Sequence, residues 1–248
     1  MLKKTKQGYY IFEKFNKFKG LTHGFSTRQF GDCSPKKKPE NWKNIEKFLK
    51  VLGLEKGNLV LMEQVHGDKI KVVGERDKSK IIPMVDGLVT KERGISLGIK
   101  TADCLPILFY EPQARIIAAV HAGWRGVLQR LPQKAIDLII RMGGLAENIE
   151  IAIGPHITKD SYNVDLQRIN LFKNKFGKLE VMTAIKNDKQ FLDLIVPTLA
   201  QFIFSGVPKN HIEVSNDCTY LNDKDFFSYR RDNENSFGEM LSVISLVN

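Results

Sequence analysis

The chain has 248 residues, of which 42% are hydrophobic, 27% charged and 9% aromatic, and this composition excludes a disordered or collagen-like chain. Lysine and arginine number 38 against 28 acidic residues, a formal net charge of +10, which alone does not select between nucleic acid, an acidic membrane surface and a phosphate-bearing substrate. The sequence has neither an apolar run long enough to span a membrane nor a signal-peptide core after its first lysines, so we expect a cytoplasmic protein.

The first predicted element is an amphipathic helix over residues 44–54. Apolar side chains recur there at helical spacing, with lysines between them and glycines at the end. From residue 59 the pattern changes to short apolar runs bounded by polar breaks, which indicates strands, several of them buried on both faces. The predicted strands are residues 59–65, 69–73, 85–90, 95–99, 105–110 and 115–120.

The second half of the chain alternates helices and strands. A helix is predicted over residues 132–142, because proline is tolerated in a first helical turn and two glycines follow. Next come a strand at 149–153, helices at 164–176 and 189–204, and a final strand at 241–246. No repeat or linker is present, so we expect one domain over residues 1–248, a mixed α/β (α+β) fold with helices packed around a mixed sheet core.

Polar residues that carry reactive side chains interrupt the predicted strands at three places. Residues 64–68 (Gln-Val-His-Gly-Asp) separate the first two strands, and residues 101–104 (Thr-Ala-Asp-Cys) separate the fourth from the fifth. Residues 121–126 (His-Ala-Gly-Trp-Arg-Gly) follow the sixth. The three junctions fall in neighbouring strand pairs, which places the chemistry of the chain at these strand ends.

His66, Cys104 and His121 are the candidate metal ligands at these junctions. Zinc accepts thiolate and imidazole in a tetrahedral shell, and catalytic zinc sites use three protein ligands with the fourth position open. The sequence spacings of 38 and 17 residues do not form a local chelate, so only folding can bring the three together. From the residues alone, three ordinary side chains with satisfied hydrogen bonds remain an equal alternative. Three widely spaced cysteines, an odd number, favour reduced thiols over a disulfide framework.

A set of motifs runs in order along nearly the whole chain. They are His23-Gly24-Phe25-Ser26-Thr27-Arg28, Gln64-Val65-His66-Gly67, Asp86-Gly87-Leu88-Val89-Thr90, Thr101-Ala102-Asp103-Cys104-Leu105-Pro106, His121-Ala122-Gly123-Trp124-Arg125-Gly126, Ile153-Gly154-Pro155, Asp217-Cys218-Thr219-Tyr220 and Phe226-Phe227-Ser228-Tyr229-Arg230-Arg231-Asp232. With these motifs the chain resembles the YfiH-type family, also called laccase-domain or multicopper polyphenol oxidase-like proteins. The resemblance implies that His66, Cys104 and His121 bind a zinc or copper ion.

The resemblance also implies an activity on small molecules. The expected reaction is phosphorolysis of purine nucleosides such as adenosine, inosine and methylthioadenosine, with phosphate as co-substrate and adenosine deamination as a second activity. Phosphorolysis requires a cationic clamp, and Arg28, Arg125 and Arg230 are candidates because guanidinium binds phosphate in a bidentate fork. Arg125 is preferred because it lies beside a ligand, four residues after His121; a surface ion pair is the alternative for each arginine.

Further candidates for the substrate site lie in the same motifs. Asp103 is suited to carry a proton to the leaving ammonia in deamination, or else to orient a ligand imidazole. Gln64 and Tyr229 are candidate substrate-binding residues beside Arg28 and Arg230. The rings of Phe25, Trp124 and Tyr229 are able to stack on a purine, although core packing is the commoner fate of an aromatic side chain.

Two segments depart from the family pattern. Residues 29–41 form a shorter segment than expected, without the usual small-residue loop, which leaves substrate contacts there undetermined. At residues 237–240 the family usually has Gly-Arg-Met, whereas this chain has Gly-Glu-Met. A phosphate-binding role therefore does not transfer to Glu239.

The histidine count excludes a four-copper oxidase within one chain. A multicopper oxidase needs about ten histidines in His-x-His pairs. This chain has five, at positions 23, 66, 121, 156 and 211, and no His-x-His pair.

Two other functions remain as alternatives. A cysteine hydrolase acting on an amide would use Cys104 as nucleophile and His121 as base, and members of the family are linked to the editing of cell-wall peptide precursors. A zinc-bound thiolate resists alkylation, whereas a free catalytic thiolate reacts at once. A basic module that binds nucleic acid without catalysis would show a salt-dependent affinity, but the lysines are scattered and do not favour it.

Overall fold

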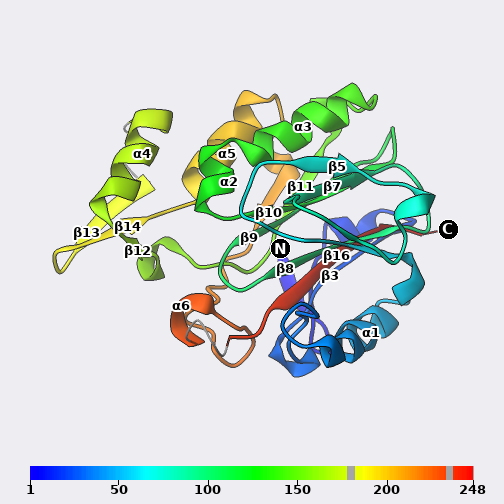
Figure 1. Cartoon of the computed structure of the whole chain (residues 1–248). Helices are drawn as coiled ribbons and strands as arrows, with labels where there is room; N and C mark the ends of the chain where they lie inside the picture. The colour runs from blue at the N-terminus through cyan, green and yellow to red at the C-terminus, as the bar shows by residue number, and fades with distance from the viewer. Residues whose placement is uncertain (178–181, 233–236, 248) are drawn as a thin grey trace.

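Two β-sheets pack face to face in the centre of the molecule, with helices on both outer faces (Figure 1). The structure is a computed structural model, and it describes residues 1–177, 182–232 and 237–247. The first sheet has the strand order β1 (Leu2–Lys4), β2 (Tyr10–Phe12), β3 (Leu21–Phe25), β16 (Met240–Leu246), β8 (Ser96–Thr101), β4 (Leu59–Met62), β6 (Ile81–Ile82). The second has the order β15 (Ile212–Val214), β11 (Glu150–Ile153), β9 (Leu105–Glu111), β10 (Ile116–Ala122), β7 (Gly87–Thr90), β5 (Ile70–Val72).

Both sheets combine parallel and antiparallel pairs. Strand β4 runs parallel to β6 and β8, and β5 parallel to β7, whereas β9, β10 and β7 form an antiparallel series. The predicted mixed α/β fold is thereby confirmed. The sequence analysis did not predict β1, β2, β3, β6, β13 or β15. Each of these strands has five residues or fewer, which is too short for a clear alternation of apolar and polar side chains.

Central strands bury side chains on both faces. In β9, Ile107 and Phe109 point to the core beneath the helices of the second sheet, whereas Leu108 and Tyr110 point to the core between the two sheets. A strand covered on both sides has no polar face, so its sequence is an uninterrupted apolar run. This explains why residues 105–110 were recognisable as a buried strand.

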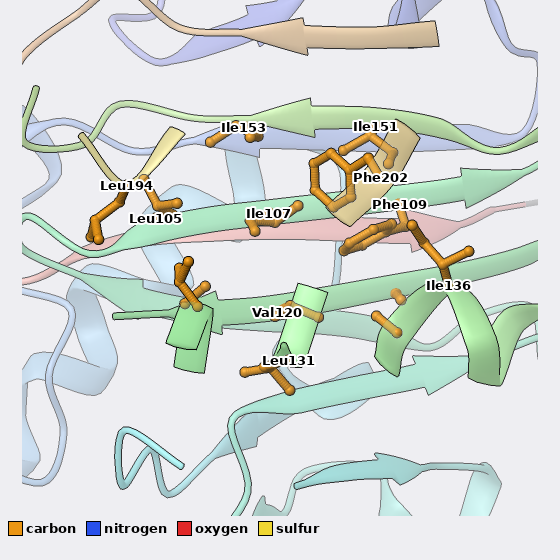
Figure 2. Close-up of a cluster of buried hydrophobic side chains, with 14 of the residues drawn as sticks. Leu105, Ile107, Phe109, Val120, Leu131, Ile136, Ile151, Ile153, Leu194 and Phe202 are labelled. Atoms are coloured by element: carbon orange, nitrogen blue, oxygen red, sulfur yellow. The ribbon is translucent and has the colours of Figure 1, made fainter. Parts of the chain in front are cut away.

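Helices cover the outer face of each sheet. Helix α1 (Trp42–Val51) packs on the first sheet through Ile45, Phe48 and Leu49, and it begins two residues before the predicted helix and ends three residues earlier. Three helices cover the second sheet: α2 (Trp124–Leu128), α3 (Leu131–Arg141) and α5 (Ile195–Phe204). Figure 2 shows Leu131 and Ile136 of α3 and Phe202 of α5 against side chains of the second sheet. Of these helices, α2 directly follows β10 and contributes Trp124 and Arg125 to the cavity described below.

The prediction of one helix over residues 189–204 was wrong. The structure has strand β14 (Lys189–Leu192) followed by helix α5, with the backbone N–H of Ile195 donating to the Asp193 carboxylate at 2.8 Å between them. Strand β14 pairs with β13 (Thr183–Lys186) and β12 (Asn163–Val164) in a third sheet. The hairpin turn has two residues, Asn187 and Asp188, both with positive φ, and this short turn was the signal overlooked in the sequence.

Helix α4 (Leu166–Phe176) and the third sheet, residues 163–177 and 183–192, form a segment that projects from the second sheet (Figure 1). Helix α4 starts at Asp165, whose carboxylate accepts the backbone N–H of Arg168 at 2.7 Å, so Val164 belongs to β12 and not to the predicted helix. The short helix α6 (Tyr229–Asp232) comes late in the sequence, before the last strand β16. No helix within the described part of the chain has the length and apolar character needed to cross a membrane.

Candidate metal centre and cavity

His66, Cys104 and His121 converge in the folded chain. Their ligand atoms all lie within 4.8 Å of one another, and the two imidazole rings are 4.8 Å apart between centroids at an interplanar angle of 81°. His66 comes from the loop between β4 and β5, Cys104 directly precedes β9, and His121 lies near the end of β10. Folding therefore brings together three side chains that are far apart in the sequence.

Strand register explains this convergence. In the antiparallel pair of β10 with β9, His121 faces Pro106 and Ala122 faces Leu105, so Cys104 is the next residue beyond the pair. On the other side of β10, Val120 faces Gly87 of β7. The residue before Gly87 is Asp86, which the register places beside His121.

Asp86 holds two of the candidate ligands in position. Its Oδ1 atom accepts hydrogen bonds from His121 Nδ1 at 2.8 Å and from the His66 backbone N–H at 3.0 Å. Its Oδ2 atom accepts the N–H groups of Val65 at 3.2 Å and Gly67 at 2.7 Å. The side chain is fully buried. A carboxylate that binds Nδ1 of a histidine leaves Nε2 to face a metal ion, as in many metal sites.

The electrostatics around the three residues favour the charged form of the thiol. Burial alone raises the pKa of Cys104, but the adjacent His121 and His66 imidazoles together outweigh burial and lower this pKa to about 7. Burial lowers the pKa of His121, and the Cys104 thiolate and the Asp86 carboxylate raise it above its ordinary value. Burial also raises the pKa of Asp86, whereas its bonds to His121 and to backbone amides bring it below the usual range. A deprotonated thiol is the form that binds metal.

The residues present fit a zinc-class ion. One thiol and two imidazoles supply the donor set of a three-ligand site, and no other group of three potential ligands occurs within residues 1–177, 182–232 and 237–247. A Cβ atom on Gly123 would lie 3.0 Å from Cys104 Sγ and 3.0 Å from His66 Cδ2. Glycine at this position therefore keeps open the space that the sulfur and imidazole groups share.

A cavity of about 920 Å³ opens onto the three residues. Trp124, Arg125 and Tyr229, all predicted for the substrate site, line it. The Arg125 guanidinium carbon lies 4.5 Å from the Trp124 ring centroid, and among the described residues no carboxylate lies within 4 Å of this guanidinium. Tyr229 is 42% exposed and contacts the ring of Phe237. The cavity thus combines a metal-type donor set, a cation and aromatic surfaces.

Asp103 lies beside the ligands but contacts other residues. Its carboxylate accepts hydrogen bonds from Thr219 Oγ1 at 2.6 Å, Ser228 Oγ at 3.0 Å and the Arg230 backbone N–H at 2.7 Å. Burial raises its pKa. Its φ of 94° is unusual for a residue other than glycine. The imidazole-orienting role belongs to Asp86 instead, and a role of Asp103 as proton carrier stays a prediction.

Two other predicted residues line the cavity with their polar groups engaged. The Gln64 side chain donates to the Lys100 carbonyl at 2.7 Å and accepts the Lys100 N–H at 2.9 Å, which braces the loop of His66 against β8. The Arg230 guanidinium donates to the backbone and side-chain oxygens of Asn163 at 2.7 and 2.8 Å. Both side chains lie at the cavity wall with backbone or amide partners already in place.

Two predicted residues lie outside the cavity lining. Arg28 forms an ion pair with Asp232 at 3.4 Å and stacks on Phe227 at 4.6 Å. Phe25 is 1% exposed and belongs to the core between the sheets, where Gly154 packs against its ring. Stacking of Phe25 on a purine is therefore wrong, because no part of this ring reaches the cavity.

Sequence reasoning missed three residues of the site. Asp86 was part of a recognised motif, and a carboxylate at the start of a buried strand was the available signal. Tyr162, just before the projecting segment, and Arg168, within it, line the cavity, and no motif lies near either. The two departures from the family pattern also meet, because the Cys33 N–H donates to the Glu239 carbonyl at 2.9 Å, and Lys36 and Glu239 both line the cavity.

The chain is similar to proteins of known family. Residues 20–247 match a family model described as multi-copper polyphenol oxidoreductase laccase. A relative named adenosine deaminase RL5, from an unknown prokaryotic organism, is 33% identical over 189 residues, 73% of this chain and 72% of that protein. Purine nucleoside phosphorylase YlmD of Geobacillus stearothermophilus is 34% identical over 195 residues, 75% of this chain and 71% of that protein. The crystal structure of Bacillus licheniformis hypothetical protein YfiH matches with a TM-score of 0.91 and 26% identity, covering 99% of this chain and 98% of the other.

Proposed function

Because the chain belongs to the multi-copper polyphenol oxidoreductase laccase family, which its motifs indicated, we propose that it is a metal-dependent purine nucleoside phosphorylase. Its substrates are adenosine, inosine and methylthioadenosine, and adenosine deamination is a second activity. The observation that carries this proposal is the convergence of His66, Cys104 and His121 on a cavity that also contains Arg125. The names of the relatives, purine nucleoside phosphorylase and adenosine deaminase, support the substrate class.

The chain supplies groups for each part of phosphorolysis. A phosphate oxygen forms a bond to C1′ of the ribose while the bond from C1′ to the base nitrogen breaks, and the base leaves with that electron pair and takes up a proton. Arg125 binds the attacking phosphate as a bidentate donor. Trp124 and Tyr229 offer ring faces to the purine. The products are the free base and ribose 1-phosphate.

The metal centre would consist of His66, Cys104 and His121, with zinc or copper as the ion. When bound, such an ion supplies Lewis acidity at its open coordination position. Asp86 keeps His121 in the tautomer with Nε2 free, and Asp103 holds Ser228 and the Arg230 backbone at the cavity wall. In deamination, water replaces the amino group at C6 of adenosine, and inosine and ammonia are released.

Product analysis with purified, metal-loaded protein tests this proposal. Adenosine with phosphate should give adenine and ribose 1-phosphate, and adenosine without phosphate should give inosine only. Removal of the metal by a chelator should abolish both, and added zinc should restore them. An Arg125→Ala variant should raise the phosphate concentration needed for half-maximal rate by roughly tenfold or more. Adenine release that is independent of phosphate or insensitive to the chelator contradicts the proposal.

A cysteine hydrolase is the second candidate, because the acidic Cys104 thiol lies beside His121 in the same cavity. In that mechanism the thiolate attacks an amide carbonyl, the C–N bond breaks and protonated His121 passes its proton to the leaving amine; water then cleaves the thioester, which releases the acid and the thiol. Metal removal then leaves activity intact or raises it, since the ion blocks the sulfur. The rate of alkylation of Cys104 before and after chelation, measured by mass spectrometry, separates the two candidates.

A further inference from the structure

Arg168 brings a second guanidinium group to the cavity. It belongs to α4 in the projecting segment, yet its guanidinium carbon lies 4.5 Å from the Trp124 ring centroid in α2. The Arg125 guanidinium carbon lies at the same distance from that centroid. The two carbons are therefore at most twice this distance apart, and both side chains line the cavity next to the metal centre.

Neither cation is neutralised by a buried carboxylate. Among the described residues, Arg125 has no carboxylate within 4 Å, and Arg168 has only Asp165, at 3.4 Å. The Asp165 side chain is 56% exposed, and its other oxygen accepts the Arg168 backbone N–H at the start of α4. The Nε atom of Arg168 is buried and donates no hydrogen bond. A buried donor without an acceptor is unfavourable, so the Arg168 side chain lacks part of its hydrogen bonding in this structure.

The size and chemistry of this arrangement fit a tetrahedral oxyanion. Guanidinium nitrogens donate to phosphate oxygens at about 2.8 Å, which puts each guanidinium carbon roughly 4 Å from the phosphorus. Two guanidinium groups that approach one phosphate at about a right angle, on the side away from the Trp124 ring, hold their carbons roughly 6 Å apart. That separation is compatible with the limit set by Trp124. Tyr162 lines the same wall and its hydroxyl lies beside the Arg168 side chain, whereas the Arg230 guanidinium is engaged with Asn163.

We propose that Arg168 and Arg125 together bind the phosphate co-substrate, on either side of the edge of Trp124. Arg168 is the residue through which the projecting segment completes the phosphate site. This inference rests on the proposed function for the identity of the anion, but the arrangement itself requires only an oxyanion. The packing of α4 against α2 thereby has a role in catalysis, because it places the Arg168 guanidinium beside Trp124.

Direct binding of inorganic phosphate tests the proposal without turnover. Isothermal titration calorimetry on the metal-loaded protein at constant ionic strength should show Arg168→Ala weakening phosphate binding by roughly ten- to a hundredfold. Arg168→Met keeps an unbranched apolar stem on Trp124 but has no donor, so it should weaken binding as much. Arg168→Lys should be intermediate, because ammonium is charged but does not form a fork. Arg141→Ala, at an exposed arginine of α3, is the matched control and should bind as the unmodified protein does.

Adenosine affinity is the readout that separates phosphate binding from a purely structural role. The phosphate site predicts that the Arg168 variants bind adenosine within about twofold of the unmodified protein. Equal loss of adenosine and phosphate affinity in Arg168→Met indicates instead that Arg168 only docks α4, and overturns the proposal. So does unchanged phosphate affinity in Arg168→Met, or a failure of the unmodified protein to bind phosphate. Arg168-dependent phosphate binding without adenine release keeps the site and overturns the phosphorylase function.

Discussion

Asp86 is the residue on which the geometry of the candidate ligands depends most. It accepts four hydrogen bonds, from the N–H groups of Val65, His66 and Gly67 and from the His121 ring. In Asp86→Asn one of its two acceptor oxygens is replaced by an NH₂ group, which faces donors. We expect zinc affinity to fall by roughly ten- to a hundredfold, the usual effect of removing a partner that orients a ligand. Competition with a chromophoric chelator measures it.

Asp225→Asn provides the control for this variant. Asp225 is also buried, but its carboxylate accepts from Tyr10 at 2.7 Å and pairs with Lys4 outside the metal centre. Its zinc affinity should equal that of the unmodified protein. If folded Asp86→Asn binds zinc as tightly as the control, the assignment of Asp86 is wrong.

At the residue scale, the ligand candidates were accessible from sequence and their supporting residues were not. His66, Cys104 and His121 combine the chemistry of zinc ligands with positions at strand ends. The role of Asp86 depends on the register of β7 against β10, which no local pattern encodes. Arg168 reaches Trp124 only through the docking of α4, so neither its spacing nor its neighbours in sequence point to the cavity.

At the element scale, the two sheets approach each other closely where Phe25 of β3 packs against Gly154, the residue after β11. A Cβ atom added to Gly154 would lie 2.2 Å from the Phe25 ring, which is 1% exposed and enclosed by the core. Gly154→Ala should therefore lower the free energy of unfolding by roughly 1–3 kcal/mol, the usual cost of overpacking a core. Urea denaturation measures this change.

Gly57→Ala is the matched control, since a Cβ atom there meets nothing within 4 Å and Gly57 has no positive φ. Its stability should change by less than about 0.5 kcal/mol. Equal stabilities of the two variants would mean that the sheets do not approach each other as closely as described.

Secondary structure was predictable where polar residues separate one strand or helix from the next. Apart from the two-residue β6, the strands from β4 to β11 lie in short apolar runs separated by polar breaks, so their order and approximate limits followed from the sequence. In residues 189–204 the strand and the helix adjoin with only two residues between them, and both are rich in apolar side chains. Pairing of β14 with β12 and β13 decided the conformation there, and such pairing is invisible to a local period.

At the scale of the whole molecule, the stability should depend on pH through His23. This buried side chain accepts the Phe12 backbone N–H at Nε2, and burial lowers its pKa to about 4. Its pKa in the unfolded chain is about 6.5. As pH falls from 6.5 toward 4, the unfolded chain binds a proton that the folded chain does not. The contribution of His23 is thus complete above pH 6.5, and below it the free energy of unfolding falls by up to about 1.4 kcal/mol per pH unit.

Replacement of His23 by glutamine isolates this contribution, because glutamine retains an acceptor and does not titrate. Urea denaturation at about pH 7.5 and pH 5 should show a smaller loss of stability on acidification for His23→Gln than for the unmodified protein. Equal losses would show that the imidazole is protonated as readily in the folded chain as in the unfolded one.

The proposed activity depends on one requirement at the cavity, that a metal ion is held by His66, Cys104 and His121. Elemental analysis of the purified protein after exposure to zinc and removal of the unbound metal measures this directly. We expect about one ion per chain in the unmodified protein and in Cys218→Ser, whose thiol contacts Ser161 instead, and close to none in Cys104→Ser. Full zinc content in Cys104→Ser, or none in the unmodified protein, would contradict the metal centre.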